Sequence, residues 1–413
     1  MAHNTSLKNF NIDYNKAVFL MLLAFAILTR AFISLGYYNI YDTFWYRRWA
    51  VASNDGLFSI YSNKTINLDY PPVYLFFLYV VGVFYKIIPN AVNDNYLNMA
   101  LMKFWPVVFD IILGVVIYIV AKKRDTKTGI FCAAFWLFNP AALFNSAFWG
   151  QTDALMCLMI FATFLLMERH PVWASVMFAL SGLTKFQSLY LLPVFLTILI
   201  FKHKIRDFFA GVFAAVGTVA AVFLPFMIGS HNPFLFFDVY LNGSNSYPYA
   251  TLNAFNIYGI FNLNWAAESN KVLGGFTYGM LGLALLIAVV ISSIVLTVFA
   301  KKKCFIVLSL VLMQSIFMLT TKMHERYQFL CLFLCLAAFI LYKKKDFFIL
   351  FGLLSFVVAI NQAVPMFDWN YQHSIFSGHS YSVIMIIMSA VNFLVYLYSL
   401  YVCVKFLFGS EQE

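Results

Sequence analysis

Residues 17–36 read AVFLMLLAFAILTRAFISLG, a run of 20 residues with a single charged side chain, Arg30. About 20 apolar residues are enough for a helix to cross the hydrocarbon core of a bilayer. No small-residue cleavage site follows the run, so it predicts a first transmembrane helix and not a removed signal peptide.

The rest of the chain has the same membrane character. Of its 413 residues, 63% are hydrophobic and 11% are charged, whereas a soluble domain has about 45–50% and about 25%. These proportions exclude a disordered chain, a secreted disulfide scaffold and a soluble nucleic-acid-binding protein, despite the net charge of +10. No nucleic acid is expected among its partners.

Further apolar runs predict an all-α, polytopic membrane protein with about 12 transmembrane helices. No linker or repeat divides the chain, so residues 1–413 are expected to form one membrane domain, with a catalytic module at 1–228 and a helical module at 229–413. The predicted spans lie at 17–36, 101–120, 129–147, 154–168, 171–185, 188–201, 208–228, 276–299, 305–321, 327–342, 346–364 and 383–406.

Most of the 27 Lys and Arg residues lie in short loops between these runs. Basic loops are retained in the cytoplasm, where they also attract the headgroups of membrane lipids. The apolar run from Val73 to Pro89 would reverse this pattern if it crossed the membrane. We therefore expect it to form a helix in the outer interface, with both termini cytoplasmic and the long polar segments outside.

Polar residues gather in those outer segments. In the first loop, Asp42 precedes Arg47 and Arg48, and it is either a general base for a hydroxyl or a solvated acid paired with the arginines. Composition alone favours the paired acid. Asp69 stands before Pro71-Pro72, where it can act as a helix N-cap or in chemistry.

Three later positions carry charge in the outer segments: an acid that a helix dipole can favour, and two basic sites where positive-inside bias disfavours Lys and Arg. Asp153 begins a predicted span, and Lys185 lies in a short outer turn with Gln187. The stretch 322–327 reads KMHERY and holds four ionisable groups. Because phosphate attracts several cationic donors, we expect an anion site from these basic residues: Lys185, Lys322, His324 and Arg326.

Two ionisable residues, Arg30 and Asp110, lie inside predicted spans, where such groups are usually paired. Lys103 lies seven residues before Asp110 and can share its helix face. A structural bond is the favoured role of Asp110. The acids form no metal-binding motif such as HExxH or DxD, so neither a metal nor another cofactor is expected. The six cysteines lie in or beside apolar runs and are expected to serve in packing.

Together these motifs resemble the GT-C superfamily of polytopic glycosyltransferases. The first outer loop, with Asp42, Arg47, Arg48 and Trp49, is similar to that of the dolichyl-phosphate-glucose-dependent glucosyltransferases of N-glycan assembly. The same family resemblance extends to Leu68–Pro72, to Lys185 and Gln187 followed by Pro193, and to His324-Glu325-Arg326, with Arg where the family has Lys. The segment from Trp149 through Gln151 to Asp153 looks more like bacterial relatives of the GPI mannosyltransferases.

The resemblance implies an inverting hexosyltransferase that uses a polyprenyl-phosphate-linked sugar at the outer membrane face. Asp42 would be the base, while Lys185, His324 and Arg326 would hold the donor phosphate. The acceptor would be a lipid-linked or polymeric glycan of the cell envelope, and the short termini favour a bacterial plasma membrane. The substrate-binding residues would be Arg47, Arg48, Asp69, Tyr70, Gln151, Asp153, Gln187 and Glu325.

Two other classes of protein remain as alternatives. A transporter or flippase of lipid-linked saccharides would also have many spans, but transporters bind their substrates near the bilayer midplane. A structural membrane subunit would leave the charged stretch 322–326 unexplained. The crowding of polar groups at the outer helix ends favours the transferase.

Overall fold

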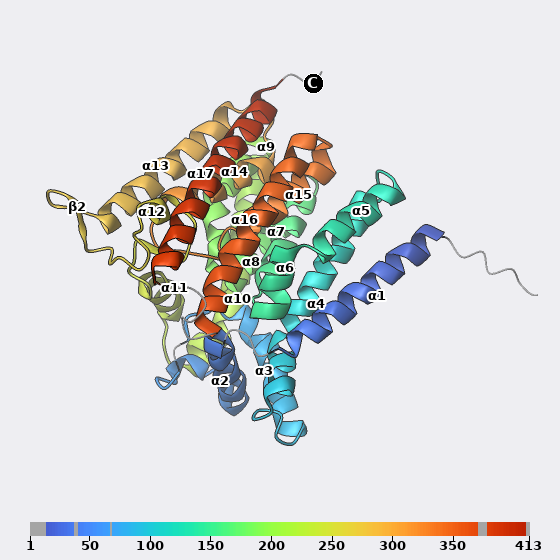
Figure 1. Cartoon of the computed structure of the whole chain (residues 1–413), viewed down its shortest axis with the longest axis vertical. Coiled ribbons are helices and arrows are strands. Elements are labelled where there is room, and N and C mark those ends of the chain that lie inside the picture. Colours follow the sequence, from blue (N-terminus) through green and yellow to red (C-terminus); the bar gives the residue numbers. More distant parts are fainter. Residues whose placement is uncertain (1–13, 37–39, 67, 371–377, 410–413) are drawn as a thin grey trace, which may run out of the picture.

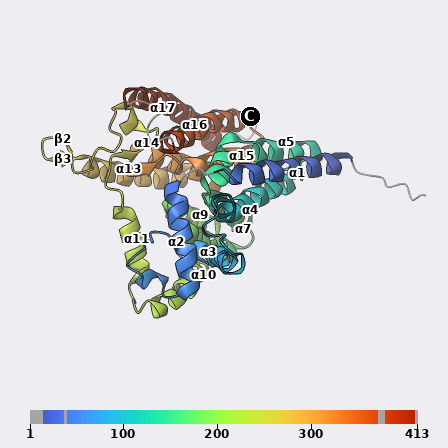
Figure 2. The ribbon, with the colours of Figure 1, turned by 60° about the horizontal axis from the view of Figure 1, so that its bottom comes forward.

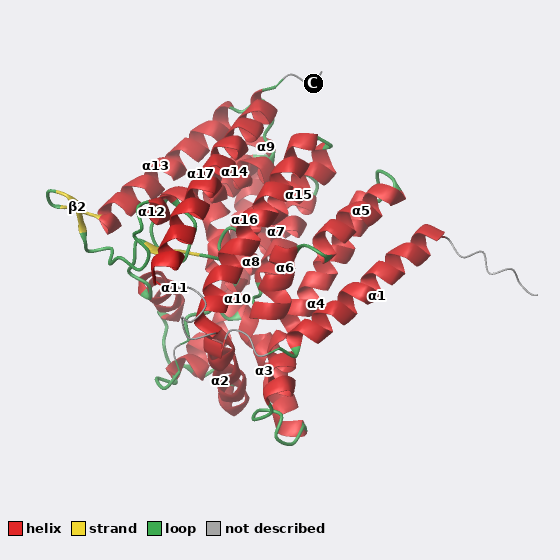
Figure 3. Ribbon diagram, in the orientation of Figure 1, coloured by secondary structure: helices red, strands yellow, loops and turns green. Residues whose placement is uncertain are grey.

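The computed structural model describes residues 14–36, 40–66, 68–370 and 378–409, and nearly all of its regular structure is helical (Figures 1 and 3). The elements are α1 Tyr14–Ser34, α2 Ile40–Gly56, η1 Ile60–Ser62, α3 Val73–Ile87, α4 Asn95–Ala121, α5 Thr126–Leu137, α6 Pro140–Leu143, η2 Phe144–Trp149, α7 Asp153–Met167, α8 Pro171–Thr184, η3 Phe186–Leu191, α9 Leu192–Lys202, α10 Ile205–Gly229, α11 Leu235–Asn245, β1 Thr251–Leu252, α12 Ile257–Ile260, β2 Lys271–Leu273, β3 Phe276–Thr277, α13 Tyr278–Phe299, α14 Phe305–Leu319, β4 Met323–His324, α15 Phe329–Tyr342, α16 Lys345–Asn370 and α17 Gly378–Phe408.

The chain is a multi-pass membrane protein. Within the described residues, six helices are long and apolar enough to cross a membrane, and the pair Thr126–Leu137 and Pro140–Trp149, bent by 50°, makes a seventh if it counts as one span. Six shorter apolar helices of 10–17 residues accompany them. The predicted total of about 12 spans requires five of these short helices to cross as well, and it stays a prediction. The long helices are α1, Tyr96–Ala121, α10, α13, Lys345–Asp368 and Tyr381–Phe408.

Helices α14 and α15 form the centre of the bundle. Almost every residue of both helices is buried, and the core around them includes side chains from α4, α7, α9, α16 and α17. By contrast, α1, α10 and α13 leave large apolar side chains exposed. A helix that is apolar all round is buried or faces lipid, so these three helices are suited to the membrane boundary. The core draws on both predicted modules, 1–228 and 229–413, and their division stays a prediction.

A fully buried ion pair fastens the first helix to the bundle. Arg30 of α1 places Nη2 2.8 Å from Asp110 Oδ2 of α4, and Trp136 Nε1 of α5 donates to Asp110 Oδ1 at 2.8 Å. Removing one partner of such a pair costs about 3–5 kcal/mol because the other charge stays buried. These contacts agree with the structural role favoured for Asp110. Lys103 instead donates to the Gly36 carbonyl at 2.8 Å.

Three helices lie across one end of the bundle. In Figure 2, α2 and α11 run across the direction of α1 and α13, with α3 beside α2. Helices α2, α3, α10 and α11 share a second hydrophobic cluster that includes Trp49, Tyr74 and Phe226. Helix α3, with 15 residues, belongs to the shorter apolar helices. Its expected interfacial position stays a prediction because length alone does not decide it.

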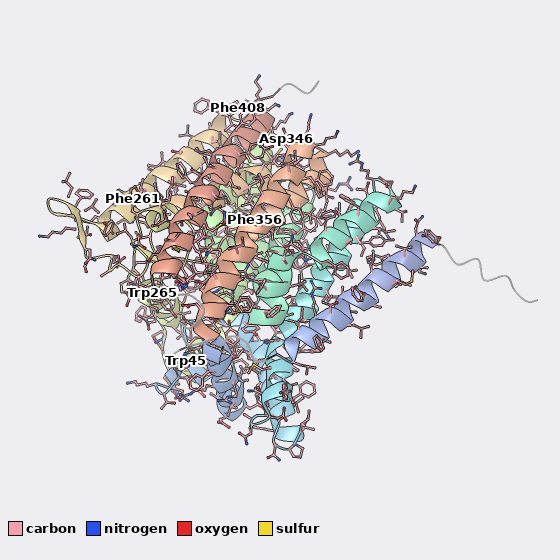
Figure 4. The ribbon with its side chains drawn as sticks, in the orientation of Figure 1. Trp45, Phe261, Trp265, Asp346, Phe356 and Phe408 are labelled. Atoms are coloured by element: carbon pink, nitrogen blue, oxygen red, sulfur yellow. The ribbon has the colours of Figure 1, made fainter. Side chains whose placement is uncertain are left out.

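The basic loops gather at the opposite end. Lys302, Lys344, Lys345 and Lys405 line one cavity between the α13–α14 connection, α16 and α17. In Figure 4, Asp346 and Phe408 mark this end, while Trp45 and Trp265 lie toward the other. The two ends therefore differ in charge as the sequence predicted. Which end faces the cytoplasm stays a prediction.

The polar segments contain more regular structure than the sequence predicted. The first loop holds helix α2, and the segment 229–275 holds α11 and β1, which pairs in parallel with β4. One expectation about a helix end is wrong. Pro72 and not Asp69 occupies the N-cap position of α3, and no side chain caps that end. Because Asp69 lies three residues earlier, its carboxyl is left for the cavity described next.

Candidate active site

Asp42 lies in the first turn of α2, where the helix dipole favours a negative charge. Two side chains from one distant segment donate hydrogen bonds to its Oδ2 atom. They are Trp149 Nε1 at 2.6 Å and Gln151 Nε2 at 2.9 Å. The carboxylate is thereby held in one orientation at the wall of a cavity, and such a group can accept a proton from a hydroxyl.

The segment that presents these donors has an irregular backbone. Asn139 caps α6 by accepting from the amide of Ala141 at 2.9 Å, and the chain continues as the π-helix η2. Gly150 then ends η2 in the left-handed conformation, with φ 81°. Glycine adopts this conformation without a Cβ clash, which lets the chain reverse between Trp149 and Gln151. Single π-turns of this kind are frequent at functional sites.

A chain of buried polar side chains extends from Gln151. Its Oε1 atom accepts from Lys185 Nζ at 2.8 Å, and Lys185 also bonds Asp153 Oδ1 at 2.7 Å. Asp153 in turn accepts from Asn145 Nδ2 at 2.7 Å. All four side chains are buried. Lys185 therefore already has an acidic and an amide partner, and its contacts connect Asp153 to the side chain that orients Asp42.

Tyr70 and Asp69 approach the same place from the loop before α3. The Tyr70 hydroxyl donates to Gln151 Oε1 at 3.2 Å and lies 2.9 Å from the hydroxyl of Tyr46. Asp69 lines the cavity beside Asp42. Burial, and secondarily the charge of Asp42, raise the pKa of the Asp69 carboxyl to about 6. The two acids therefore differ in their surroundings.

The third side of the site is the predicted charged stretch after α14. Lys322 adopts a left-handed conformation (φ 63°), after which Met323–His324 pairs with Thr251–Leu252. Arg326 Nη1 donates to Glu325 Oε1 at 2.8 Å, and its guanidinium lies 5.5 Å from the Trp149 ring centroid. The buried Nε atom of Arg326 has no hydrogen-bond partner among the described residues.

Burial also sets the protonation of this stretch. It lowers the pKa of His324 well below its usual range, and the neighbouring charge of Arg326 lowers it further. His324 is therefore a neutral imidazole at pH 7, which can still donate one hydrogen bond. Burial raises the pKa of Glu325, while the Arg326 guanidinium opposes that shift.

Three cavities meet around these groups. The first, of about 90 Å³, is lined by Asp42, Asp69, Lys185, Gln187 and Arg326, and by the rings of Tyr70 and Tyr240. The second, of about 480 Å³, runs between η3 and α13 and ends at Lys322 and His324. The third, of about 390 Å³, contains Asp42, Trp149, Glu325 and Arg326. Asp42 and Arg326 thus line both the first cavity and the third.

Most of the predicted site residues come together here, but two do not. Arg48 Nη2 donates to the Thr65 carbonyl at 3.0 Å, and Arg47 Nη1 donates to the Val92 carbonyl at 3.4 Å. Neither arginine lines the three cavities. Their binding roles stay predictions. Lys322 lines the second cavity, and its Nζ atom lies 3.3 Å from Glu268 Oε2.

The aromatic lining of the site was not predicted. Tyr247 lines all three cavities, and its ring lies 4.8 Å from that of His324. The chain has 25 tyrosines, so no spacing distinguishes this one in the sequence. Among the described residues, no group of three or more His, Cys, Asp and Glu side chains could hold a metal ion. The metal-free expectation stays a prediction.

Comparison with known proteins matches the chain to a family. Residues 68–300 match the sequence profile described as Glycosyltransferase family 87. The match covers more than half of the chain and contains Asp69, Gln151, Asp153 and Lys185, whereas Asp42 and Arg326 lie outside it. No curated protein matches the chain.

Proposed function

The chain belongs to glycosyltransferase family 87, and we propose that it moves a hexose, glucose or mannose, from a polyprenyl-phosphate carrier to a glycan acceptor. The acceptor is a lipid-linked or cell-envelope glycan. One observation carries the proposal. The oriented carboxylate of Asp42 and the guanidinium of Arg326 both line the first and the third cavity, beside the partly apolar second cavity.

The reaction follows from that arrangement. An acceptor hydroxyl in the third cavity transfers its proton to Asp42 as its oxygen attacks C1 of the donor sugar. The bond between C1 and the phosphate oxygen breaks, and the polyprenyl phosphate leaves with the electron pair. In this scheme the acceptor oxygen attacks C1 on the face opposite the leaving phosphate, so the configuration at C1 inverts.

The second cavity suits the lipid part of the donor. Its walls include Tyr190 of η3 and Leu283 and Leu286 of α13, which are apolar or aromatic, and its inner end holds Lys322 and His324. A polyprenyl chain can lie along the apolar wall while its phosphate meets the polar end. His324 would donate a hydrogen bond, and Arg326 would stabilise the charge that develops on the leaving phosphate.

The remaining residues have positioning roles in this scheme. Lys185 and Asp153 fix Gln151, which orients Asp42, and Tyr70 supports the same amide. Asp69 and Gln187 line the smallest cavity and would bind hydroxyls of the transferred sugar. Lys185 would also add positive charge near the donor phosphate. Glu325 holds the Arg326 guanidinium at 2.8 Å.

We further propose a GT-C-type architecture in the plasma membrane, with both termini in the cytoplasm. The active site then faces the extracytoplasmic side, where polyprenyl-phosphate sugars and envelope glycans meet. The clustering of lysines at the far end of the bundle supports this orientation. No metal ion or cofactor takes part in the scheme.

A donor panel tests the proposal. The purified protein in lipid nanodiscs receives radiolabelled polyprenyl-phosphate glucose or mannose, or the corresponding nucleotide sugar, together with a membrane extract as acceptor. We expect label to reach a glycan only from a polyprenyl-phosphate donor. Transfer from the nucleotide sugar alone would contradict the proposal.

The donor phosphate site has its own test. Arg326→Gln and His324→Ala should weaken binding of the polyprenyl-phosphate sugar about tenfold or more, since each removes a donor to a charged group. Asp55→Asn, an exposed position on α2, is the control and should bind normally. Unchanged donor affinity in both variants would contradict the placement of the donor phosphate at Arg326 and His324.

A further inference from the structure

The third cavity extends beyond the proposed reaction centre to a second group of aromatic side chains. Asp42 and Trp149 lie in its wall together with Tyr249 and Trp265. The indole of Trp265 is 49% exposed, although its residue belongs to an ordered loop between β1 and β2. A large aromatic side chain that remains half exposed inside a cavity offers a flat apolar surface to a ligand.

The indole is held in place by its neighbours. Trp265 Nε1 donates to Asn253 Oδ1 at 3.1 Å, and its ring lies 5.2 Å from that of Tyr249 at an interplanar angle of 69°. The backbone amide of Trp265 donates to the Thr251 carbonyl at 2.9 Å. These contacts fix both the ring and its main chain, so the exposed surface has a defined orientation.

The backbone of this loop is strained. Asn253, Asn262 and Trp265 all have positive φ, at 57°, 55° and 59°. Asparagine tolerates the left-handed conformation, but for a bulky residue such as tryptophan it is an outlier. Such strain persists only where the surroundings over-determine the conformation, and it is concentrated at ligand-binding sites.

The same loop is tied directly to the proposed phosphate site. Strand β1 pairs in parallel with β4, so Leu252 lies opposite His324, and Asn253 forms a further bridge to His324. Trp265 is therefore connected through β1 to β4 and the stretch that carries Arg326.

We propose that Trp265, with Tyr249 beside it, forms a subsite that binds a pyranose ring of the acceptor glycan. One face of a pyranose carries mainly C–H groups, which pack against an indole, while its hydroxyls point outward to polar partners. Ser246 and Glu325 line the same cavity and can hydrogen-bond those hydroxyls. The subsite rests on the proposed function, since it places the acceptor so that one of its hydroxyls reaches Asp42.

A membrane anchor is the alternative role of an exposed tryptophan, because such residues are enriched at bilayer interfaces. Phe261 supplies the matched control. It lies in the same loop, is 68% exposed, and does not line the cavity. Figure 4 shows the two side chains apart from each other. An anchoring loop would respond to the loss of either side chain, whereas a sugar subsite responds only to Trp265.

Saturation-transfer NMR tests the subsite without relying on turnover. The full-length protein in nanodiscs is mixed with methyl α-mannopyranoside or methyl α-glucopyranoside, with empty nanodiscs as background. We expect transfer to the C–H protons of at least one glycoside in the wild type, in Trp265→Phe and in Phe261→Ala. The signal should fall at least about threefold in Trp265→Ala. An equal signal in Trp265→Ala, or none in the wild type, would overturn the proposal.

Kinetics separate this inference from the proposed function. Trp265→Ala should raise the KM for the acceptor about tenfold, with kcat and the KM for the donor changed less than about twofold. Trp265→Phe should restore most of the affinity. If no lipid-linked donor is consumed at all, the proposed function fails while the NMR result still decides the subsite. If transfer occurs but Trp265→Ala has the wild-type acceptor KM, the subsite alone is wrong.

Discussion

Asp42 and Asp69 line one cavity, but their surroundings differ. Two side-chain donors hold Asp42, from Trp149 and Gln151. Asp69 is half-buried, and its carboxyl has a pKa of about 6. In the proposed reaction the two acids have different tasks: Asp42 takes a proton, and Asp69 binds sugar hydroxyls while its own charge changes near pH 6.

Asp69→Asn should make the protein more stable and less active at neutral pH. Folding raises the pKa of this acid above its unfolded value of about 3.9, so the ionised form is disfavoured in the folded state. That cost grows from about pH 4 to about pH 6 and is complete above pH 6. Removing it should add on the order of 2 kcal/mol at pH 7.5, since partial exposure screens the full shift.

Thermal unfolding in detergent at pH 7.5 and pH 4.5 measures this effect. The gain in Tm of Asp69→Asn should be larger at pH 7.5. Wild-type transfer should decline as the pH falls below about 6, and this decline should be absent from whatever activity the variant keeps. A gain in Tm that is equal at the two pH values would contradict the assigned burial of Asp69.

Several of the site residues could be predicted because their charge stood in the wrong place. Lys185 and Arg326 are basic residues in segments that the charge pattern predicts to be extracytoplasmic, where basic residues are disfavoured. In the structure, Lys185 donates to the carboxylate of Asp153 and to the amide oxygen of Gln151. The sequence did not predict these contacts because both partners lie in another connection between helices. Tyr247 and Trp265 gave no such signal because aromatic residues are common throughout this chain.

Helix α2 carries Asp42, so its packing against α3 governs the site. Gly82 of α3 lies against α2 so closely that an added Cβ would come within 2.1 Å of the Ala50 carbonyl oxygen. Asn54 of α2 also donates to the Tyr79 carbonyl of α3 at 2.9 Å. The backbones of the two helices therefore lie in close contact at this point. A methyl group added at Gly82 would push α2 and α3 apart.

Gly82→Ala should reduce both stability and transfer. Overpacking of this kind costs about 1–3 kcal/mol, and the shift of α2 would move Asp42 from its donors. Gly352→Ala is the matched control, because it too lies inside a helix but has no atom within 4 Å of the added Cβ. That change should be neutral or stabilise by up to about 1 kcal/mol. Equal Tm values and rates in the two variants would show that α2 does not depend on this contact.

At the scale of elements, apolar runs could be predicted far better than polar connections. The predicted span 305–321 is α14 at Phe305–Leu319, and 171–185 is α8 at Pro171–Thr184. Helix α2 was missed because aromatic, basic and acidic residues alternate in it without an apolar stripe. The pairing of β1 with β4 joins two-residue strands about 70 positions apart, which leaves no periodic signal.

At the scale of the whole molecule, lysines gather at one end and the candidate site lies at the other. The charge pattern predicts that the lysine-rich end faces the cytoplasm and that the site faces the outside. Helix α3 belongs to the site end, where Lys86 donates to the Asn54 carbonyl at 3.0 Å. The connection after α3 should therefore be extracytoplasmic.

Cysteine labelling in intact cells measures this orientation. In a Cys304→Ser background, Asn93→Cys should react with a membrane-impermeant maleimide without permeabilisation. Lys301→Cys, at the other end, should react only after permeabilisation. The remaining native cysteines are buried and should stay unlabelled. The reverse pattern would place the site in the cytoplasm and would contradict the proposed topology.

The proposed transfer of a sugar depends on Asp42 as its base. The most direct measurement compares single-turnover transfer by the wild type, Asp42→Asn and the control Asp55→Asn, with donor binding measured on the same samples. We predict that Asp42→Asn lowers the rate by about 10²–10⁴-fold while donor affinity stays within about twofold. Asp55→Asn should match the wild type. An Asp42→Asn enzyme that kept the wild-type rate would show that Asp42 is not the base.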